Sequence, residues 1–235
     1  MEALPPGIFS PLAPGHSVAT LVLIENSEEM MSRWPDLRDR YLPNLLGTMR
    51  RANPHVPIQI LWMTSCPAPS EDQLSPSFNR SRQYNQLPEL RPIAHPKNRI
   101  SLGTLYRALE LLSSTFQDVP TTRHLIVVSA STPIDDLDDM VGIPSTPDSH
   151  SAWDYLSSVV CQKSIYLHMI LTPAPGHDMD KFVRLHADTS RIQGCCNANP
   201  WFQADLDKYS FFLSCPVNPV PAMQQGQYML DATLK

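Results

Sequence analysis

A run of residues near the N-terminus, Val18 to Ile24, is almost continuously apolar and rich in β-branched side chains. A strand with one face in water alternates apolar and polar residues, whereas a strand covered on both faces does not. Similar runs occur at residues 56–63, 124–130 and 165–171. The pattern therefore predicts parallel strands inside a sheet that is covered on both faces.

Segments with helical periodicity separate these runs. Apolar side chains recur every three or four positions in residues 37–49, 105–116, 153–160 and 182–185, as on the buried face of a helix. Pro43 lies inside the first segment, where we expect it to kink the helix. Because strands and helices alternate, we predict an α/β fold of three layers, an open, mostly parallel sheet with helices on both faces. This is the Rossmann-like arrangement.

Further along the chain the pattern is less regular. We expect residues 195–202 to form a loop and residues 209–214 a short strand that closes one edge of the sheet. The chain has 235 residues, of which 24 are Pro and 8 are Gly, so we expect a single domain with long, stiff loops. The predicted divisions are a Pro-rich lead-in at 1–17, a domain at 18–215 with a long insertion at 66–99, and an irregular tail at 216–235.

Charge and hydropathy argue against two classes of partner. The formal net charge is -5, and a protein that binds the phosphate backbone directly usually carries a broad basic face. No apolar run approaches the roughly 20 residues that span a bilayer. We therefore expect a protein made inside the cell that contacts neither nucleic acid nor membrane directly.

Sequence motifs for catalysis are largely missing. Neither a Gly-x-Gly-x-x-Gly segment nor a P-loop is present, and Ser129, at the end of a predicted strand, lacks the Gly-x-Ser-x-Gly elbow of a hydrolase. Cys195 and Cys196, with His177 and His186, lack the paired spacing of a zinc site. We therefore expect no enzymatic activity and no cofactor. A small α/β hydrolase that uses Ser129 or a cysteine remains an alternative.

The loop after the first strand reads Glu25-Asn26-Ser27-Glu28-Glu29, and here the sequence resembles the von Willebrand A domains. In that family an acidic residue, serines two and four positions on, a threonine and an aspartate from later loops bind a divalent cation. Glu25 and Ser27 match the first two positions. Glu29 replaces the second serine, and Ala130 stands where the aspartate is expected.

The threonine position falls near Ile100 or Leu102, and Thr104 is a poorly placed substitute. The resemblance therefore implies a degenerate metal site at Glu25, Ser27, Glu29 and Ala130 that holds no metal. An adhesion-type A domain, which binds a protein ligand through a metal ion, is the first alternative, ahead of the hydrolase.

One branch of the family fits better, the von Willebrand A domains of Mediator complex subunit 25. The resemblance covers about residues 18–190 and is carried by the order and spacing of residues 22–27, 37–43, 101–109 and 124–128. It implies a non-enzymatic scaffold in the nucleus that docks a coactivator subunit onto Mediator and links activators with RNA polymerase II. The implied partners are other Mediator subunits or transcription factors.

Aromatic and Arg side chains dominate the centres of protein interfaces. The loops of this sequence offer several of them, although such residues can equally be solvated or packed against the core. The candidate partner-binding residues are Arg80, Arg82, Tyr84, Arg91, Trp201 and Phe202.

Overall fold

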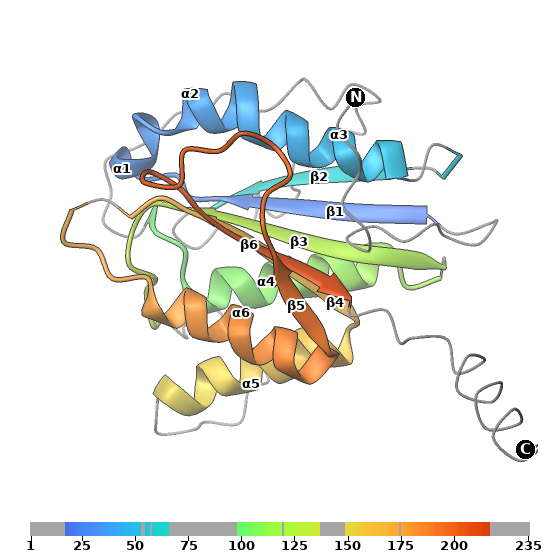
Figure 1. Cartoon of the computed structure of the whole chain (residues 1–235). Coiled ribbons are helices and arrows are strands. Elements are labelled where there is room, and N and C mark those ends of the chain that lie inside the picture. The colour runs from blue at the N-terminus through green and yellow to red at the C-terminus, as the bar shows by residue number, and fades with distance from the viewer. Residues whose placement is uncertain are drawn as a thin grey trace, which may run out of the picture.

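A computed structural model describes residues 17–52, 55–56, 58–65, 98–118, 120–136, 149–173 and 175–216 (Figure 1). Nearly all of the predicted lead-in at 1–17, most of the insertion at 66–99 and nearly all of the tail lie outside the described residues, so their predicted roles stay predictions. Ser17, the last residue of the predicted lead-in, is the first residue of β1.

The described strands form one six-stranded sheet in the order β2-β1-β3-β4-β6-β5. The first four run parallel to one another, and β6 pairs antiparallel with both β4 and β5. The predicted open, mostly parallel sheet is therefore confirmed. The strands are β1 (Ser17–Ile24), β2 (Ile58–Thr64), β3 (Thr121–Ser129), β4 (Ile165–Leu171), β5 (Cys195–Ala198) and β6 (Ser210–Pro216).

Helices cover both faces of this sheet, also as predicted (Figure 1). Side chains of β1 alternate between two cores: Leu21 and Leu23 lie in one, Val22 and Ile24 in the other, and all are fully buried. No described helix is long and apolar enough to cross a bilayer. One face carries α1 (Glu28–Met31), α2 (Trp34–Asp36), the π-helical segment η1 (Leu37–Tyr41) and α3 (Leu42–Ala52); the other carries α4 (Leu102–Thr115), α5 (Ser149–Gln162) and α6 (Asp180–Gln193).

The π-helical segment ends at Tyr41, two residues before Pro43. Proline has no N–H to donate to the preceding turn, and a single widened turn is a common way to accommodate a break in the helical ladder. Here the N–H of Leu42 bonds the carbonyl of Leu37, five residues earlier. The Asn44 side chain donates to the Arg40 carbonyl at 2.8 Å. The expected interruption at Pro43 therefore takes the form of a π turn.

Two expectations for the C-terminal part are wrong. Residues 195–198, predicted as loop, form the edge strand β5, and β6 lies inside the sheet between β4 and β5. Residues of low β-propensity form this strand because β6 supplies a partner for their backbone. Helix α6 also extends well past the apolar periodic segment at residues 182–185. Its later buried positions are the polar Thr189 and Ser190, so the hydropathy pattern does not show that the helix continues.

Three histidines are buried on β3, β4 and α6. The rings of His124 and His168 stack with centroids 5.3 Å apart, and their Nδ1 and Nε2 atoms lie 3.0 Å from each other. His186 Nε2 lies 3.2 Å from the Ser214 hydroxyl. Burial lowers the pKa of His124 from 6.5 to about 3 and that of His186 to about 4. Burial, reinforced by the other two histidines, also lowers the pKa of His168 well below its usual value.

We expect the free energy of unfolding to fall as the pH drops below 6.5, the value these histidines regain in the unfolded chain. The unfolded chain then binds protons that the folded chain excludes, so the stability present above pH 6.5 is lost progressively towards the folded-state values near 4 and 3. Each histidine contributes up to about 1.4 kcal/mol per pH unit. Urea unfolding between about pH 7 and pH 4.5 measures this slope.

The slope of the free energy of unfolding against pH is proportional to the number of protons taken up on unfolding. Replacing His186 by Gln should reduce that number by about one. The matched control is His55→Gln, because His55 is exposed, and it should leave the slope unchanged. A stability that stays constant from neutral pH down to about pH 5 would contradict the prediction.

Candidate functional site

The carboxyl ends of β1 and β3 meet around the side chain of Glu25, which is fully buried. The strand register brings them together, because Ile24 pairs with Val128 and the Glu25 N–H donates to the Val128 carbonyl at 2.9 Å. The loop after β1 therefore lies beside the loop that starts at Ser129. Open parallel sheets bind their ligands at this end of the strands.

Five hydrogen-bond donors from these two loops converge on the Glu25 carboxylate. Oε1 accepts the hydroxyl groups of Ser27 and Ser131, each at 2.5 Å. Oε2 accepts the Ser129 hydroxyl at 2.5 Å and the backbone N–H groups of Ala130 and Ser131 at 2.7 and 3.0 Å. We call these residues, Glu25 with Ser27, Ser129, Ala130 and Ser131, the serine cage.

The serine cage explains how a carboxylate is tolerated without water. An ionised carboxylate accepts hydrogen bonds only and offers about four lone-pair positions, which five donors fill. These charge-assisted bonds offset the large cost of moving the charge out of water. A divalent cation at this point would compete with two backbone N–H groups and three hydroxyl hydrogens for the same oxygens. The cage therefore stabilises the Glu25 carboxylate with hydrogen-bond donors, in the place that a cation would otherwise take.

Three of the four residues in the predicted degenerate metal site come together in the cage: Glu25, Ser27 and Ala130, the last through its backbone N–H. Glu29, the fourth, lies beside the cage and is hydrogen-bonded to Ser27. Thr104, the weak substitute for the missing threonine, bonds Ser101 Oγ at 2.9 Å at the N-terminus of α4. It helps to cap that helix.

Sequence reasoning missed Ser129 and Ser131 as partners of Glu25. The resemblance directs attention to the aspartate expected at position 130, whereas the bonds come from the serines on either side of it. The available signal was a pair of hydroxyl residues flanking a small residue, opposite a lone carboxylate in a neighbouring parallel strand. Its meaning depends on the register of β1 and β3, which the sequence does not contain.

Glu29 forms a second, more exposed group beside the cage. Its Oε1 lies 3.6 Å from His177 Nε2 and 3.9 Å from Arg99 Nη2, and His177 Nδ1 accepts the Thr132 N–H at 3.2 Å. Partial burial acts to raise the pKa of Glu29, but hydrogen bonds from its own backbone and Ser27, with Arg99 and His177 nearby, lower it overall. This group fastens the loops after β3 and β4 to α1.

The candidate nucleophile Ser129 is not presented to a substrate. Its side chain is fully buried, and its hydroxyl donates to Glu25 and to the Ser131 carbonyl. A hydrolase serine needs an exposed oxygen within reach of a base. The placement of Ser129 is therefore structural.

Trp201 and Phe202 are half-buried on the face that carries α3. The Trp201 indole N–H donates to Thr48 Oγ1 at 2.8 Å, and the Phe202 ring packs 5.4 Å from that of Phe211. Both side chains thus cover the core while keeping part of their surface exposed. The remaining partner-binding candidates, Arg80, Arg82, Tyr84 and Arg91, lie outside the described residues.

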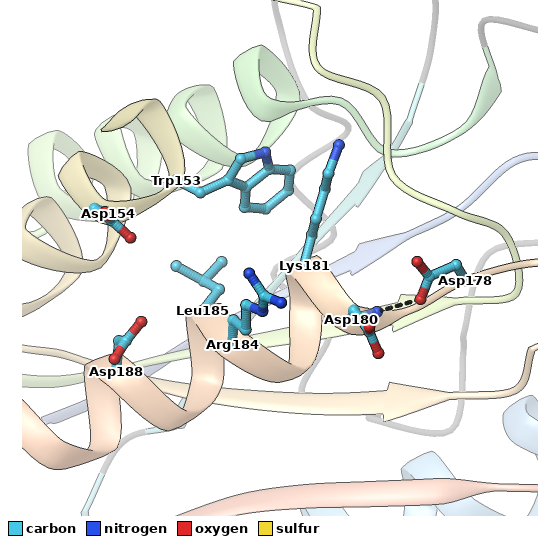
Figure 2. A pocket seen from close by; sticks show the side chains of 8 residues that line it. All are labelled: Trp153, Asp154, Asp178, Asp180, Lys181, Arg184, Leu185 and Asp188. Atoms are coloured by element: carbon cyan, nitrogen blue, oxygen red, sulfur yellow. Dashed lines mark hydrogen bonds between the residues drawn. The ribbon is translucent and has the colours of Figure 1, made fainter. Parts of the chain in front are cut away.

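A shallow pocket of about 200 Å³ opens between α5 and α6 (Figure 2). Trp153 and Leu185, both buried, form its apolar wall. Trp153 donates its indole N–H to Asp135 at 2.8 Å, and Lys181 bonds the same carboxylate at 2.5 Å. The polar lining comes from Asp154, Asp178, Asp180, Lys181, Arg184 and Asp188.

No family model matches the chain, and no curated protein matches it significantly. Among the described residues, no group of three or more His, Cys, Asp or Glu side chains is arranged to hold a metal ion.

We expect Glu25→Gln to destabilise the fold by about 3 kcal/mol, because the new amide N–H₂ faces buried donors and leaves them without an acceptor. Urea unfolding at neutral pH measures the change. Ser129→Ala should cost less, about 1–2 kcal/mol, since four donors remain.

Glu29→Gln is the matched control. Its carboxylate is 30% exposed and its two ion pairs are long, so we expect a change below about 1 kcal/mol. Equal losses for Glu25→Gln and Glu29→Gln would show that the cage has no special role in stability.

Proposed function

We propose that this chain is a non-enzymatic protein-interaction domain whose role is like that of the von Willebrand A domains of Mediator complex subunit 25. In this proposal it acts in the nucleus, docks onto other Mediator subunits or transcription factors, and helps to link activators with RNA polymerase II. The observation that supports it most is the serine cage. It occupies the end of the sheet where an A domain would bind metal, and its oxygens are engaged in internal hydrogen bonds.

The cage favours recognition by surface shape over recognition by a bridging cation. In a metal-dependent domain the ion needs open coordination positions, which a partner's carboxylate can complete. Glu25 is fully buried beneath its donors. Under our proposal the partner therefore contacts side chains on the loops and helices around this end of the sheet.

The loop at residues 199–209 is the best placed of the described segments to present such side chains. Arg40 donates to the Gln203 carbonyl at 3.2 Å, and the Tyr41 hydroxyl accepts the Asp205 N–H at 3.1 Å. Leu206, between these anchors and β6, is 64% exposed. A fixed loop loses little conformational freedom on binding, and the exposed leucine on it offers apolar surface that a partner can bury.

We expect Leu206→Ser to reduce the recovery of Mediator subunits from nuclear extract by the tagged full chain at least roughly tenfold, the effect of one buried anchor. Quantitative mass spectrometry of the captured proteins measures it. The matched control is Ile192→Ser on α6, since Ile192 is 51% exposed on the other face of the sheet. Unchanged capture by Leu206→Ser would remove this loop from the interface.

Charge reversal at Arg80 and Arg82 tests the insertion in the same assay. Loss of capture with an unchanged melting temperature would place the interface there. If the wild-type chain recovers no Mediator or transcription-factor subunit, the proposed function is wrong.

The two alternatives give different results in the same preparation. Under our proposal, capture survives removal of divalent cations by EDTA, whereas loss that added Mg²⁺ restores would favour the adhesion-type A domain. We also expect no turnover of generic esters. Turnover that Ser129→Ala abolishes, with the protein still folded, would favour the hydrolase.

A further inference from the structure

Three cysteines gather on the two antiparallel strands at the edge of the sheet. Cys195 and Cys196 lie on β5, Cys215 lies on β6, and all three thiols are free. Cys196 and Cys215 are direct cross-strand partners. Opposite residues of an antiparallel pair have Cα atoms about 4.5–5.5 Å apart, inside the range of about 4.4–6.8 Å that a disulfide requires.

The orientation of the side chains selects one pair from the three. Cross-strand partners project to the same face of a sheet, and consecutive residues project to opposite faces. Cys196 therefore shares a face with Cys215, and the two side chains are close enough to hydrogen-bond. Cys195 projects to the other face, where Cys161 interacts with it electrostatically.

The two paired thiols differ in access. Cys196 is exposed, whereas Cys215 is buried, with 6% of its surface accessible. A reagent in solution therefore reaches Cys196 before the buried Cys215, which lies next to Cys196 across the two strands. In thiol–disulfide exchange, an accessible cysteine attacks an external disulfide, and a second cysteine beside it then resolves the mixed disulfide. The exposed Cys196 next to the buried Cys215 matches this arrangement.

We propose that Cys196 is a thiol-exchange site for small-molecule disulfides of the glutathione class and that Cys215 is its resolving cysteine. The Cys196 thiolate attacks one sulfur of oxidised glutathione, forming a mixed disulfide and releasing one reduced glutathione. The Cys215 thiolate then attacks the Cys196 sulfur, forming the Cys196–Cys215 disulfide and releasing the second glutathione. Two protein thiols are oxidised, one external disulfide is reduced, and both protons leave with the glutathione products.

The second step is the slower one. Burial, together with the neighbouring Cys196 and Cys195, raises the pKa of Cys215 to about 11, and exchange requires the thiolate. The mixed disulfide should therefore be detectable near neutral pH and should resolve faster as the pH rises.

The bond would close the base of the loop at residues 199–209. That loop leaves β5 after Ala198, two residues beyond Cys196, and carries Trp201, Phe202 and Leu206. It enters β6 at Ser210, five residues before Cys215. Closing a loop of this size restricts the unfolded chain, so we expect the melting temperature to rise by roughly 5 °C. This inference concerns the fold alone and does not rest on the proposed function.

The test incubates the reduced, full-length protein with oxidised glutathione and follows its intact mass over time. We expect first the addition of one glutathione and then a product two hydrogen atoms lighter than the reduced chain. Peptide mapping should link Cys196 to Cys215. A link between any other pair, or a glutathione adduct that persists as the pH is raised, would overturn the proposal.

Three serine variants sharpen the result. Cys215→Ser should stop at the Cys196 adduct, Cys196→Ser should form neither product at these positions, and Cys195→Ser should behave like the wild type. Circular dichroism of each variant checks that it folds. If a variant does not fold, peptide mapping of the oxidised wild-type protein still tests which cysteines are linked. If Cys195→Ser rather than Cys196→Ser blocks the reaction, the assignment is wrong.

Discussion

The carboxylate of Glu25 is a charge removed from water, and the carboxyl end of the sheet is arranged around it. Leaving such a group without donors would cost several kcal/mol. Five donors from the loops after β1 and β3 avoid that cost. Four of these bonds, from Ser129, Ala130 and Ser131, cross between neighbouring strands, so they form only when β1 and β3 pair in the observed register. The cage therefore ties the conformation of both loops to the correct assembly of the sheet.

Around this centre the remaining loops are fastened in a second layer. Glu29 forms ion pairs with Arg99 and His177. Thr132 is hydrogen-bonded to His177 and Asp178, which lie in the loop after β4. A network of this kind holds the loops in one arrangement before any partner arrives. Such preorganisation lowers the entropic cost of binding, and it is what a scaffold that recognises partners by shape requires. The function that we propose depends on this rigidity.

The two regions that carry our proposals lie on different strands of the sheet. The cage lies at the carboxyl ends of the central parallel strands, whereas the cysteine pair lies on the antiparallel strands β5 and β6. The loop at residues 199–209 connects the second region to the face that carries α3, through Trp201 and Thr48. Oxidation of the cysteines would therefore act on the position of this loop without touching the cage.

The sequence by itself determined the layers of the fold, because the continuous apolar runs at residues 18–24, 124–130 and 165–171 can be buried only inside a covered sheet. It also placed Glu25 and Ser27 at the end of the first strand. It did not reveal β5, whose residues have weak strand preference and depend on β6 as a partner. Nor could it show that Ser129 and Ser131 bind Glu25, more than a hundred positions away. Such contacts depend on the register between strands, and only the folded chain fixes that register.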